Sequence, residues 1–271
     1  MSKTLSPLVS IITINYGGSK NVEQLWASIV QHETKLDYEF IVVDNASPND
    51  DASRLDQIFA GTAAHVIKLE KNLGFGGGYG EGVKFARGTY LAIINPDIKL
   101  NAHCLSTLIS TLEVDKNIGL VAPKLLSPNG QVQQNARHFP TPWVMFGRRL
   151  ATKFQWAYDC QPSWYTSKTP VAVDWVQGSF MVTRRTTFVN DLQGFDARFF
   201  LFLEDTDLCR RLWQQARRVL LVPTATAVHG EHRLSGGSLW QAWRKKTFWI
   251  HLHSALKYFW KYRGQALPDI K

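Results

Sequence analysis

Gly88-Thr-Tyr-Leu-Ala-Ile-Ile-Asn-Pro-Asp97 is the stretch that decides the fold of this chain. Its centre, residues 90–94, is a short apolar run with little alternation, which predicts a strand buried on both faces of a sheet. Pro96 has no N–H and ends the ladder, so Asp97 is expected just past the carboxyl end of that strand. Ligands bind at that edge of an open α/β sheet, and a carboxylate beside an amide can hold a divalent cation. The alternative is that Asp97 caps the helix that begins near Asn101, and this stretch alone does not decide between the two.

The flanking sequence repeats a strand-and-helix unit on both sides of this stretch. Apolar runs predict strands at residues 8–15, 40–43, 64–69 and 118–122. Helical periodicity falls between them, at residues 21–32, 51–59 and about 102–114. Strands that alternate with helices of this length indicate right-handed βαβ units and a parallel sheet. The sequence therefore predicts the α/β class, with a Rossmann-like, mostly parallel sheet flanked by helices.

The repeat breaks in the second half of the chain. Residues 137–170 are rich in Pro and aromatic residues without a clean period, which predicts a long loop or a mobile lid. Regular pattern returns over residues 171–184, then as a helix at 204–216 and a strand at 218–222, where Pro223 is expected to turn the chain.

The composition is that of an ordinary globular protein: of 271 residues, 45% are hydrophobic and 20% are charged. The three cysteines, Cys104, Cys160 and Cys209, are odd in number and far apart, so they form neither a disulfide framework nor a zinc site. That usage fits a reducing compartment. The first residues lack the apolar core of a signal peptide, and no apolar run approaches the roughly 18 residues of a membrane span. We therefore expect a cytoplasmic protein.

The positive charge is concentrated at the C-terminal end. From residue 237 to residue 271 there are seven Lys and Arg against one Asp, a net charge of +6. The preceding 236 residues carry 24 against 21, a net charge of +3, out of the total of +9. A nearly balanced body with a basic tail argues against nucleic acid as a partner and indicates an acidic surface met by the tail.

A Gly-rich segment, residues 72–82, precedes the deciding stretch. Its glycines do not satisfy the i, i+2, i+5 spacing of a dinucleotide-binding loop, and no Gly-Lys-Ser/Thr follows as in a phosphate-binding loop. Two roles remain for so many glycines before a helix: close approach of the backbone to a ligand, or tight helix packing.

Polar side chains end three of the expected strands at one sheet edge: Asn15-Tyr16, Asp44-Asn45 and Asn95-Pro96-Asp97. Such a series suits a ligand with a base, a ribose and phosphates. The motifs and their order resemble glycosyltransferase family 2, the inverting enzymes of the GT-A fold, and within it the bacterial rhamnosyltransferase-like branch. The matching pieces run from residue 9 to about residue 238: Val9-Ser-Ile-Ile-Thr-Ile-Asn-Tyr16, Val42-Val-Asp-Asn-Ala-Ser47, Asn72-Leu-Gly-Phe75, Asn95-Pro-Asp97, Asp174-Trp-Val-Gln-Gly-Ser179, Gly194-Phe-Asp196, Glu204-Asp205 and His229.

The resemblance implies a nucleotide-sugar site at this edge. Asp44 would accept a hydrogen bond from the imide N–H of uracil or thymine, and Asn95 would meet the ribose. Asp97 would ligate Mg²⁺ or Mn²⁺ on the donor diphosphate, with His229 as the second protein ligand and His232 as its competitor. Further donor contacts would come from Asn15, Tyr16, Asn72 and Gly74. Relatives usually carry Asn-Asn where this chain has Tyr79-Gly80, a departure within the donor site.

Three acids follow an apolar run at the start of the helix expected at 204–216. A helix N-terminus favours acids, so capping explains Glu204 or Asp207. Asp207 lies about 200° round the helix from Asp205, so these two cannot share a role. The resemblance makes Asp205 the general base that removes the proton of the acceptor hydroxyl. It also places Glu204, Trp175 and Gly178 in the acceptor wall, with a core position as the alternative for the Trp.

Residues 238–263 predict an amphipathic helix. On a helical wheel one sector is apolar and the basic residues gather opposite. The helix can therefore lie in the headgroup layer of an anionic membrane, or pack on the body with its lysines solvated. The apolar sector holds Phe248, Trp249, Leu252, Leu256, Phe259 and Trp260, and the opposite side holds Lys246, His253, Lys257 and Lys261.

These features together predict a metal-dependent inverting glycosyltransferase, peripheral on the inner face of the cytoplasmic membrane. The resemblance implies dTDP-L-rhamnose as the donor and a polyprenyl-diphosphate-linked saccharide of a surface polysaccharide as the acceptor. The alternatives are a UDP-hexose donor, or a nucleotide-sugar-binding module without catalysis. We expect residues 1–236 to form the GT-A domain, with a donor half at 1–123 and an acceptor half at 124–236. Residues 237–271 would form the C-terminal extension.

Overall fold

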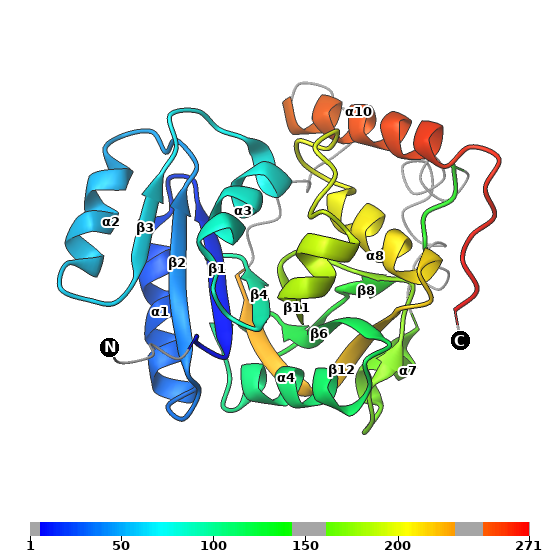
Figure 1. Cartoon of the computed structure of the whole chain (residues 1–271), viewed down its shortest axis with the longest axis horizontal. Helices are drawn as coiled ribbons and strands as arrows, with labels where there is room; N and C mark the ends of the chain where they lie inside the picture. The colour runs from blue at the N-terminus through cyan, green and yellow to red at the C-terminus, as the bar shows by residue number, and fades with distance from the viewer. Residues whose placement is uncertain (1–5, 143–160, 231–245, 271) are drawn as a thin grey trace.

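One sheet runs through the molecule, in the order β3-β2-β1-β4-β11-β6-β12-β5 (Figure 1). The computed structural model describes residues 6–142, 161–230 and 246–270. The first four strands along the chain pair in parallel, as expected: β1 (Val9–Asn15), β2 (Tyr38–Asp44), β3 (His65–Lys68) and β4 (Tyr90–Ile94). Every residue of β4 is buried, because the strand lies inside the sheet and is covered on both faces.

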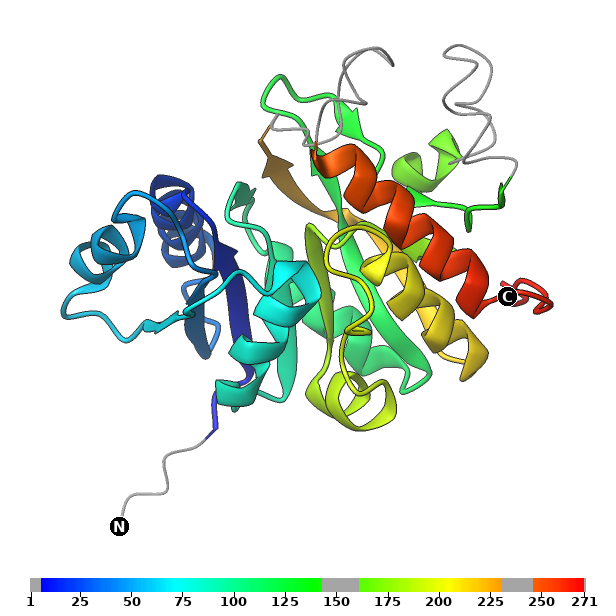
Figure 2. The same ribbon diagram turned by 90° about the horizontal axis from the view of Figure 1, so that it is seen from above.

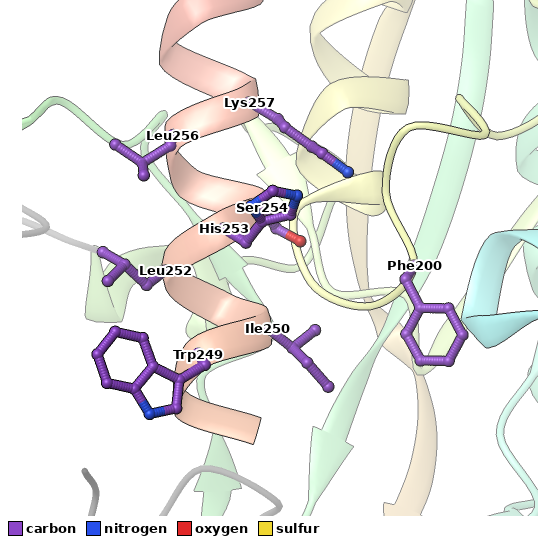
Figure 3. Close-up of a pocket in the computed structure, with 8 residues that line it drawn as sticks. All are labelled: Phe200, Trp249, Ile250, Leu252, His253, Ser254, Leu256 and Lys257. Atoms are coloured by element: carbon purple, nitrogen blue, oxygen red, sulfur yellow. The ribbon is translucent and has the colours of Figure 1, made fainter. Parts of the chain in front are cut away.

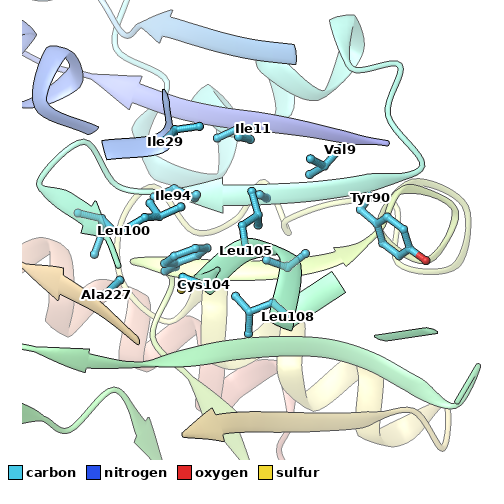
Figure 4. Packing of buried hydrophobic residues seen from close by; sticks show 14 of the residues in the cluster. Val9, Ile11, Ile29, Tyr90, Ile94, Leu100, Cys104, Leu105, Leu108 and Ala227 are labelled. Carbon is cyan, nitrogen blue, oxygen red and sulfur yellow. The ribbon is translucent and has the colours of Figure 1, made fainter. Parts of the chain in front are cut away.

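Helices cover both faces of the sheet and create two apolar layers. One layer contains residues of α1 (Ser19–His32), α2 (Asp51–Phe59) and α4 (Cys104–Val114), and Figure 4 shows part of it around Ile94, Leu105 and Leu108. The other contains residues of α3 (Gly74–Phe85) and α8 (Glu204–Gln214). The expected α/β class is confirmed, and the alternation of apolar residues along β1 supplies both layers.

The second half of the sheet is mixed rather than parallel. β11 (Phe180–Arg184) runs antiparallel between β4 and β6 (Ile118–Leu126). β12 (Arg218–His229) then pairs in parallel with β6, and the short β5 (Ile98–Leu100) pairs antiparallel with β12. β11, a strand of the expected acceptor half, is therefore inserted between two strands that pair with it through residues of the expected donor half.

The prediction that a strand ends at residue 222 with a turn at Pro223 was wrong. β12 continues to His229, and its pairing with β6 shifts register between Val222 and Thr226. A proline is tolerated in a strand at such an irregularity, because the ladder has no N–H to lose there. The extension carries His229 to the carboxyl edge of the sheet.

The region expected as a loop, residues 137–170, contains more regular structure than its sequence suggests. β8 (Ala136–Arg137) pairs with β10 (Trp175–Val176) in a small second sheet, and the short helix α7 (Pro162–Thr166) packs nearby. Residues 143–160, the centre of the expected lid, lie outside the described residues. The remaining short elements are β7 (Val132–Gln133), β9 (Val171–Ala172) and a π-helical turn at Thr187–Asp191.

The C-terminal helix α10 (Lys246–Lys261) lies alongside α8 (Figures 1 and 2). Its residues Ala255 and Tyr258, with Tyr262 just beyond it, are buried against Phe199 and Leu203 of the body. The interpretation that this helix packs on the body is thus confirmed for one face. The other face stays exposed, and Trp260 keeps 70% of its surface accessible. No helix among the described residues is long and apolar enough to cross a membrane.

Candidate active site

The carboxyl ends of β1 and β2 form a hydrogen-bonded carboxylate cluster. The Asn15 amide donates to Asp44 Oδ1 at 2.8 Å and to Asp51 Oδ2 at 2.7 Å, and the backbone N–H of Ser47 donates to Asp44 Oδ2 at 3.1 Å. These bonds fix the orientation of Asp44, the residue expected to recognise the base. Asn15 is fully buried behind it, whereas Tyr16 is 59% exposed at the rim. Sequence reasoning missed Asp51, because its partner lies 36 residues away.

The Gly-rich segment begins at a tight contact within the protein. Gly74 has φ +74°, and a Cβ there would lie 2.0 Å from the carbonyl oxygen of Phe200. That carbonyl accepts a hydrogen bond from the Phe75 N–H at 2.8 Å. Packing, rather than approach to a ligand, therefore explains the glycine at position 74. The Asn45 side-chain oxygen holds the same turn by accepting the Leu73 N–H at 2.8 Å, and the Asn72 side-chain oxygen accepts the Gly74 N–H at 2.8 Å.

Asp97 and His229 meet at the ends of β4 and β12. His229 Nε2 lies 3.5 Å from Asp97 Oδ1, and the Gly230 N–H donates to the Asp97 carbonyl at 2.9 Å. The Gln133 amide nitrogen donates to the His229 carbonyl at 3.1 Å, so the amide oxygen faces Nδ1 of the ring at 2.8 Å. Because the Gln133 oxygen can only accept, Nδ1 of the ring is the donor in this contact, and in the neutral ring the lone pair is then on Nε2, the atom that faces Asp97.

A carboxylate facing an imidazole lone pair suits a divalent cation whose other ligands come from a diphosphate. Two protein ligands are all that the described residues supply, since they contain no group of three His, Cys, Asp or Glu that could hold a metal on its own. His232, the competing ligand, lies outside the described residues. The pair Asp97 and His229 thus fits the expected metal site, with Gln133 as a partner that sequence reasoning missed.

Asn95 joins this edge to the expected acceptor side. Its N–H donates to the Ser179 carbonyl at 2.8 Å, and its side-chain oxygen accepts from the Tyr79 hydroxyl at 3.4 Å. Burial and the nearby Asp97 charge raise the pKa of Tyr79 well above its ordinary value, so the phenol stays neutral. Tyr79 is fully buried and packs on Phe75 with ring centroids 4.8 Å apart. Tyr79, which stands where relatives usually carry an Asn, therefore fills the apolar layer beneath the site.

Asp205 lies in the first turn of α8, where two backbone N–H groups hold its carboxylate in place. Its Oδ2 accepts the Gly178 N–H at 2.9 Å, and its Oδ1 accepts the Thr206 N–H at 2.7 Å. Burial raises the pKa of Asp205 despite these hydrogen bonds. The residue as a whole is buried, with 9% of its surface exposed. A partly hydrogen-bonded carboxylate with a raised pKa can accept a proton from a hydroxyl placed against it.

Glu204, the neighbouring acid, has a different environment. It is buried, and its Oε2 has no hydrogen-bond partner in the described structure. Burial and the Asp205 charge raise the pKa of Glu204 well above its ordinary value. We therefore assign the proton of this adjacent pair to Glu204, which leaves Asp205 as the carboxylate.

Asp207 makes no side-chain cap hydrogen bond at the start of α8 and is bound to other partners. Its fully buried carboxylate accepts from Arg211 Nε at 2.8 Å, from the Tyr262 hydroxyl at 2.8 Å and from Lys261. Lys261 also bonds Asp196 at 2.7 Å. The expectation that Lys261 is solvated was wrong. It is one of the links that fasten α10 to the helix of the candidate base, and we call this group the α8–α10 clamp (Asp196, Asp207, Arg211, Lys261 and Tyr262).

Trp175 lies on β10 beside the candidate base, and it is largely buried. Its indole N–H donates to the His138 carbonyl at 2.9 Å, and the Arg137 guanidinium lies 5.8 Å from its ring centroid. Gly178, two residues beyond β10, packs against both Phe75 and Asp205; a Cβ there would lie 2.9 Å from the Phe75 ring. Sequence reasoning did not single out Arg137, because one Arg in an aromatic, Pro-rich region carries no signal of its own.

The fold of the chain is similar to that of glycosyltransferases of the GT-A type. The chain superposes on the crystal structure of GalNAc-T7 with UDP, GalNAc and Mn²⁺ with a TM-score of 0.67 and 16% identity, over 87% of this chain and 46% of that one. It also matches the mannosyltransferase PcManGT of Pyrobaculum calidifontis, in complex with GDP-Man and Mn²⁺, with a TM-score of 0.59 and 16% identity. That match covers 94% of this chain and 65% of the other.

The sequence comparisons define the family. The profile of glycosyl transferase family 2 matches residues 10–171, and the chain belongs to that family. It is 22% identical to the N-acetylglucosaminyl-diphospho-decaprenol L-rhamnosyltransferase of Mycobacterium tuberculosis, over 86% of this chain and 79% of that protein. It is 38% identical to the rhamnosyltransferase WbbL of Escherichia coli K12 over 86 residues, which are 32% of this chain and 30% of that one. The protein is therefore a glycosyltransferase, and the predicted rhamnosyltransferase-like branch is confirmed.

Proposed function

We propose that this glycosyltransferase moves L-rhamnose from dTDP-L-rhamnose to a saccharide carried on polyprenyl diphosphate, with inversion at the anomeric carbon. The observation that carries the proposal is the position of Asp205. This carboxylate is held by the Gly178 N–H, and the next residue, Ser179, is hydrogen-bonded to Asn95 at the donor edge. One backbone segment thus joins the candidate base to the candidate donor site. The similarity to two rhamnosyltransferases supports the choice of sugar.

The residues of the chain would divide the work as follows. Asp44, fixed by Asn15 and Ser47, accepts the imide N–H of the base, and Tyr16 at the rim offers a flat face for stacking. Asp205 takes the proton of the acceptor hydroxyl while that oxygen bonds to the anomeric carbon. The bond from this carbon to the diphosphate oxygen breaks on the opposite face, and its electron pair leaves with the nucleotide diphosphate. Attack from the face opposite the leaving group gives inversion.

A divalent cation, Mg²⁺ or Mn²⁺, would be held by Asp97 and His229. When bound, it supplies positive charge that offsets the charge growing on the departing diphosphate. Two similar structures were determined with Mn²⁺, which supports a metal of this class. The chain's own contribution is the orientation of the ligands, through Gln133 on the His229 ring and Gly230 on the Asp97 backbone.

The outer face of α10 supports a peripheral position on the inner face of the cytoplasmic membrane. Figure 3 shows Trp249, Leu252 and Leu256 directed away from Phe200, beside a hollow of about 550 Å³. Farther along, the Arg263 guanidinium lies 4.3 Å from the ring centroid of the exposed Trp260. Aromatic side chains flanked by cations suit the headgroup layer of an anionic bilayer, where a lipid-linked acceptor keeps its sugar.

The experiment is a donor and acceptor screen with the purified full-length chain in Mn²⁺. Thermal shifts identify the nucleotide sugar, and transfer to a short polyprenyl-diphosphate N-acetylglucosamine is followed by chromatography. We expect dTDP-L-rhamnose to stabilise the protein and to be consumed. Stabilisation by a UDP-hexose alone would support the alternative donor. Binding without transfer or hydrolysis for any acceptor would support a non-catalytic module.

A further inference from the structure

We propose that Asp51 is a positioning residue of the donor site: it holds the Asn15 amide so that Asp44 meets the imide N–H of the nucleotide base in a fixed orientation. This inference rests on the proposed function and adds a residue to the recognition of the base. Asp51 does not touch the nucleotide itself, but acts through Asn15. The sequence motif that contains Asp44 ends at Ser47 and gives Asp51 no role.

Asp51 joins the start of α2 to the start of α1 and the end of β1. Only 5% of its surface is exposed, although it is the first residue of α2. Its Oδ1 accepts the Ser19 hydroxyl at 2.6 Å, and its Oδ2 accepts the Ser19 N–H at 3.1 Å and the Asn15 amide at 2.7 Å. Burial would raise the pKa of Asp51, but these hydrogen bonds outweigh it and hold the pKa below the ordinary value. Asp51 is therefore a carboxylate at neutral pH, a group that accepts hydrogen bonds and donates none.

The Asn15 amide is oriented by the groups on its two sides. Its oxygen accepts the Gly18 N–H at 2.9 Å. Its nitrogen donates to Asp44 Oδ1 at 2.8 Å and to Asp51 Oδ2 at 2.7 Å, with the Ser47 hydroxyl as a third acceptor at 3.0 Å. An amide nitrogen carries two hydrogens, so each carboxylate can take one of them. A rotated amide would turn its oxygen toward two carboxylates, and Asp51 supplies the second of these.

The orientation of Asp44 decides whether a base can be bound, because Asp44 leaves only 2% of its surface exposed. Its Oδ1 is fixed by Asn15, and its Oδ2 is fixed by the Ser47 N–H at 3.1 Å. A carboxylate oxygen has two lone pairs, so each oxygen of Asp44 keeps one for an N–H of the base. Without Asp51, the Asn15 amide loses one of its two carboxylate partners. We then expect Asp44 to lose the orientation that the base requires.

The bonds to Ser19 allow a different interpretation, in which Asp51 only fastens α1 to α2. Ser19 is the first residue of α1, and the N–H groups of a first helical turn have no partner within their own helix. The two roles depend on different bonds, because the Ser19 hydroxyl meets Oδ1 and the Asn15 amide meets Oδ2. Variants can therefore separate them.

The test is calorimetric titration of the purified full-length chain, in Mn²⁺, with two nucleotides that differ at one position of the base. One is dTDP, and the other is dTDP methylated on the imide nitrogen, which has no N–H to offer Asp44. Asp51→Ala should weaken dTDP binding about fivefold to tenfold, the contribution of one hydrogen bond, and leave the affinity for the methylated nucleotide unchanged. In an Asp44→Ala background the same substitution should have no further effect, because the two residues act along one chain of hydrogen bonds.

Ser19→Ala is the matched control, because it removes the bond to Oδ1 of Asp51 and leaves the bond to Asn15 in place. It should bind dTDP like the wild type, whereas a loss equal to that of Asp51→Ala would mean that Asp51 only fastens the two helices. Equal losses for both nucleotides in Asp51→Ala would also reject the positioning role. If Asp51→Ala does not fold, Asp51→Glu replaces it, because this variant keeps the charge and moves the carboxylate by one methylene. Selectively weakened dTDP binding by Asp51→Glu supports the inference, and unchanged binding overturns it.

Failure of the proposed function has a different signature. If the wild type consumes a UDP-hexose and not dTDP-L-rhamnose, UDP and its imide-methylated form replace the two probes, since uracil has the same imide N–H. If the wild type transfers no sugar, the binding of dTDP still decides through the same variants. A wild type that binds dTDP and the methylated nucleotide equally would reject the inference, because no imide N–H would then meet Asp44.

Discussion

The α8–α10 clamp makes the strongest quantitative prediction, because its central carboxylate is buried. Tyr262→Phe removes one hydrogen bond from Asp207, whose side chain has no exposed surface. A hydrogen bond to a charged acceptor contributes about 1.5–3 kcal/mol. Lys261→Met removes a cation shared by Asp207 and Asp196, and breaking a buried pair costs about 3–5 kcal/mol. Because 16% of the Lys261 side-chain surface is exposed to solvent, we expect a loss near about 3 kcal/mol, the lower end of that range.

Urea unfolding at neutral pH measures these losses in the free energy of unfolding. The control is Lys84→Met, which breaks the exposed ion pair with Glu81 on α3 and should cost less than about 1 kcal/mol. In an Asp207→Asn background the Lys261→Met loss should shrink, because the two side chains interact directly. Equal small losses for Lys261→Met and Lys84→Met would refute the reasoning and make Lys261 an ordinary surface lysine.

The clamp also predicts an acid dependence. Burial alone would raise the pKa of Asp196, but hydrogen bonds from Arg198 and Lys261 outweigh it and hold the pKa below the ordinary value. A carboxyl with a depressed folded-state pKa stabilises fully above its unfolded pKa of about 4, and the stabilisation is lost as the pH falls below that value. The difference in stability between the wild type and Lys261→Met should therefore narrow in acid.

Three further predictions concern the site and the outer face of α10. Asp97→Ala should abolish transfer and weaken nucleotide binding in Mn²⁺ while the melting temperature holds, and full activity in EDTA would contradict the metal site. Asp205→Asn should lower turnover by roughly 10²–10⁴-fold with donor affinity unchanged. Glu204→Gln should lower turnover only slightly, because an amide imitates the neutral carboxyl group of Glu204. A larger loss of turnover in Glu204→Gln than in Asp205→Asn would exchange the roles of the two acids. Trp260→Ser should weaken binding to anionic vesicles about tenfold, and Val114→Ser, which alters an exposed apolar residue on α4, should not.

The first half of the fold could be predicted because its signals are local. Apolar runs and the residues that end them define β1, β2 and β4, and the structure finds Asp44, Asn95 and Asp97 at their carboxyl ends. The resemblance added Asp205 and His229, which local pattern alone could not bring to the same region. The roles of these residues stay predictions.

The rest depends on distant partners that a single sequence does not reveal. Asp51 and Gln133 act through residues 36 and 96 positions away. Pro223 was a misleading signal, since a register shift accommodates it inside β12. The helical wheel gave the amphipathic character of α10, but it did not show that Lys261 points into the body, where it binds the buried carboxylate of Asp207 and the partly buried carboxylate of Asp196.

The place of β11 in the sheet bears on how the chain must be made. β4 is complete at residue 94, yet the strand that covers its free edge, β11, begins at residue 180. During synthesis the nascent chain carries an unpaired edge of five apolar residues until that later segment emerges. A fragment that stops near residue 123 would keep this edge permanently and should associate with other copies. Production of the donor half alone is therefore expected to require β11, supplied either in the same chain or as a complementing strand.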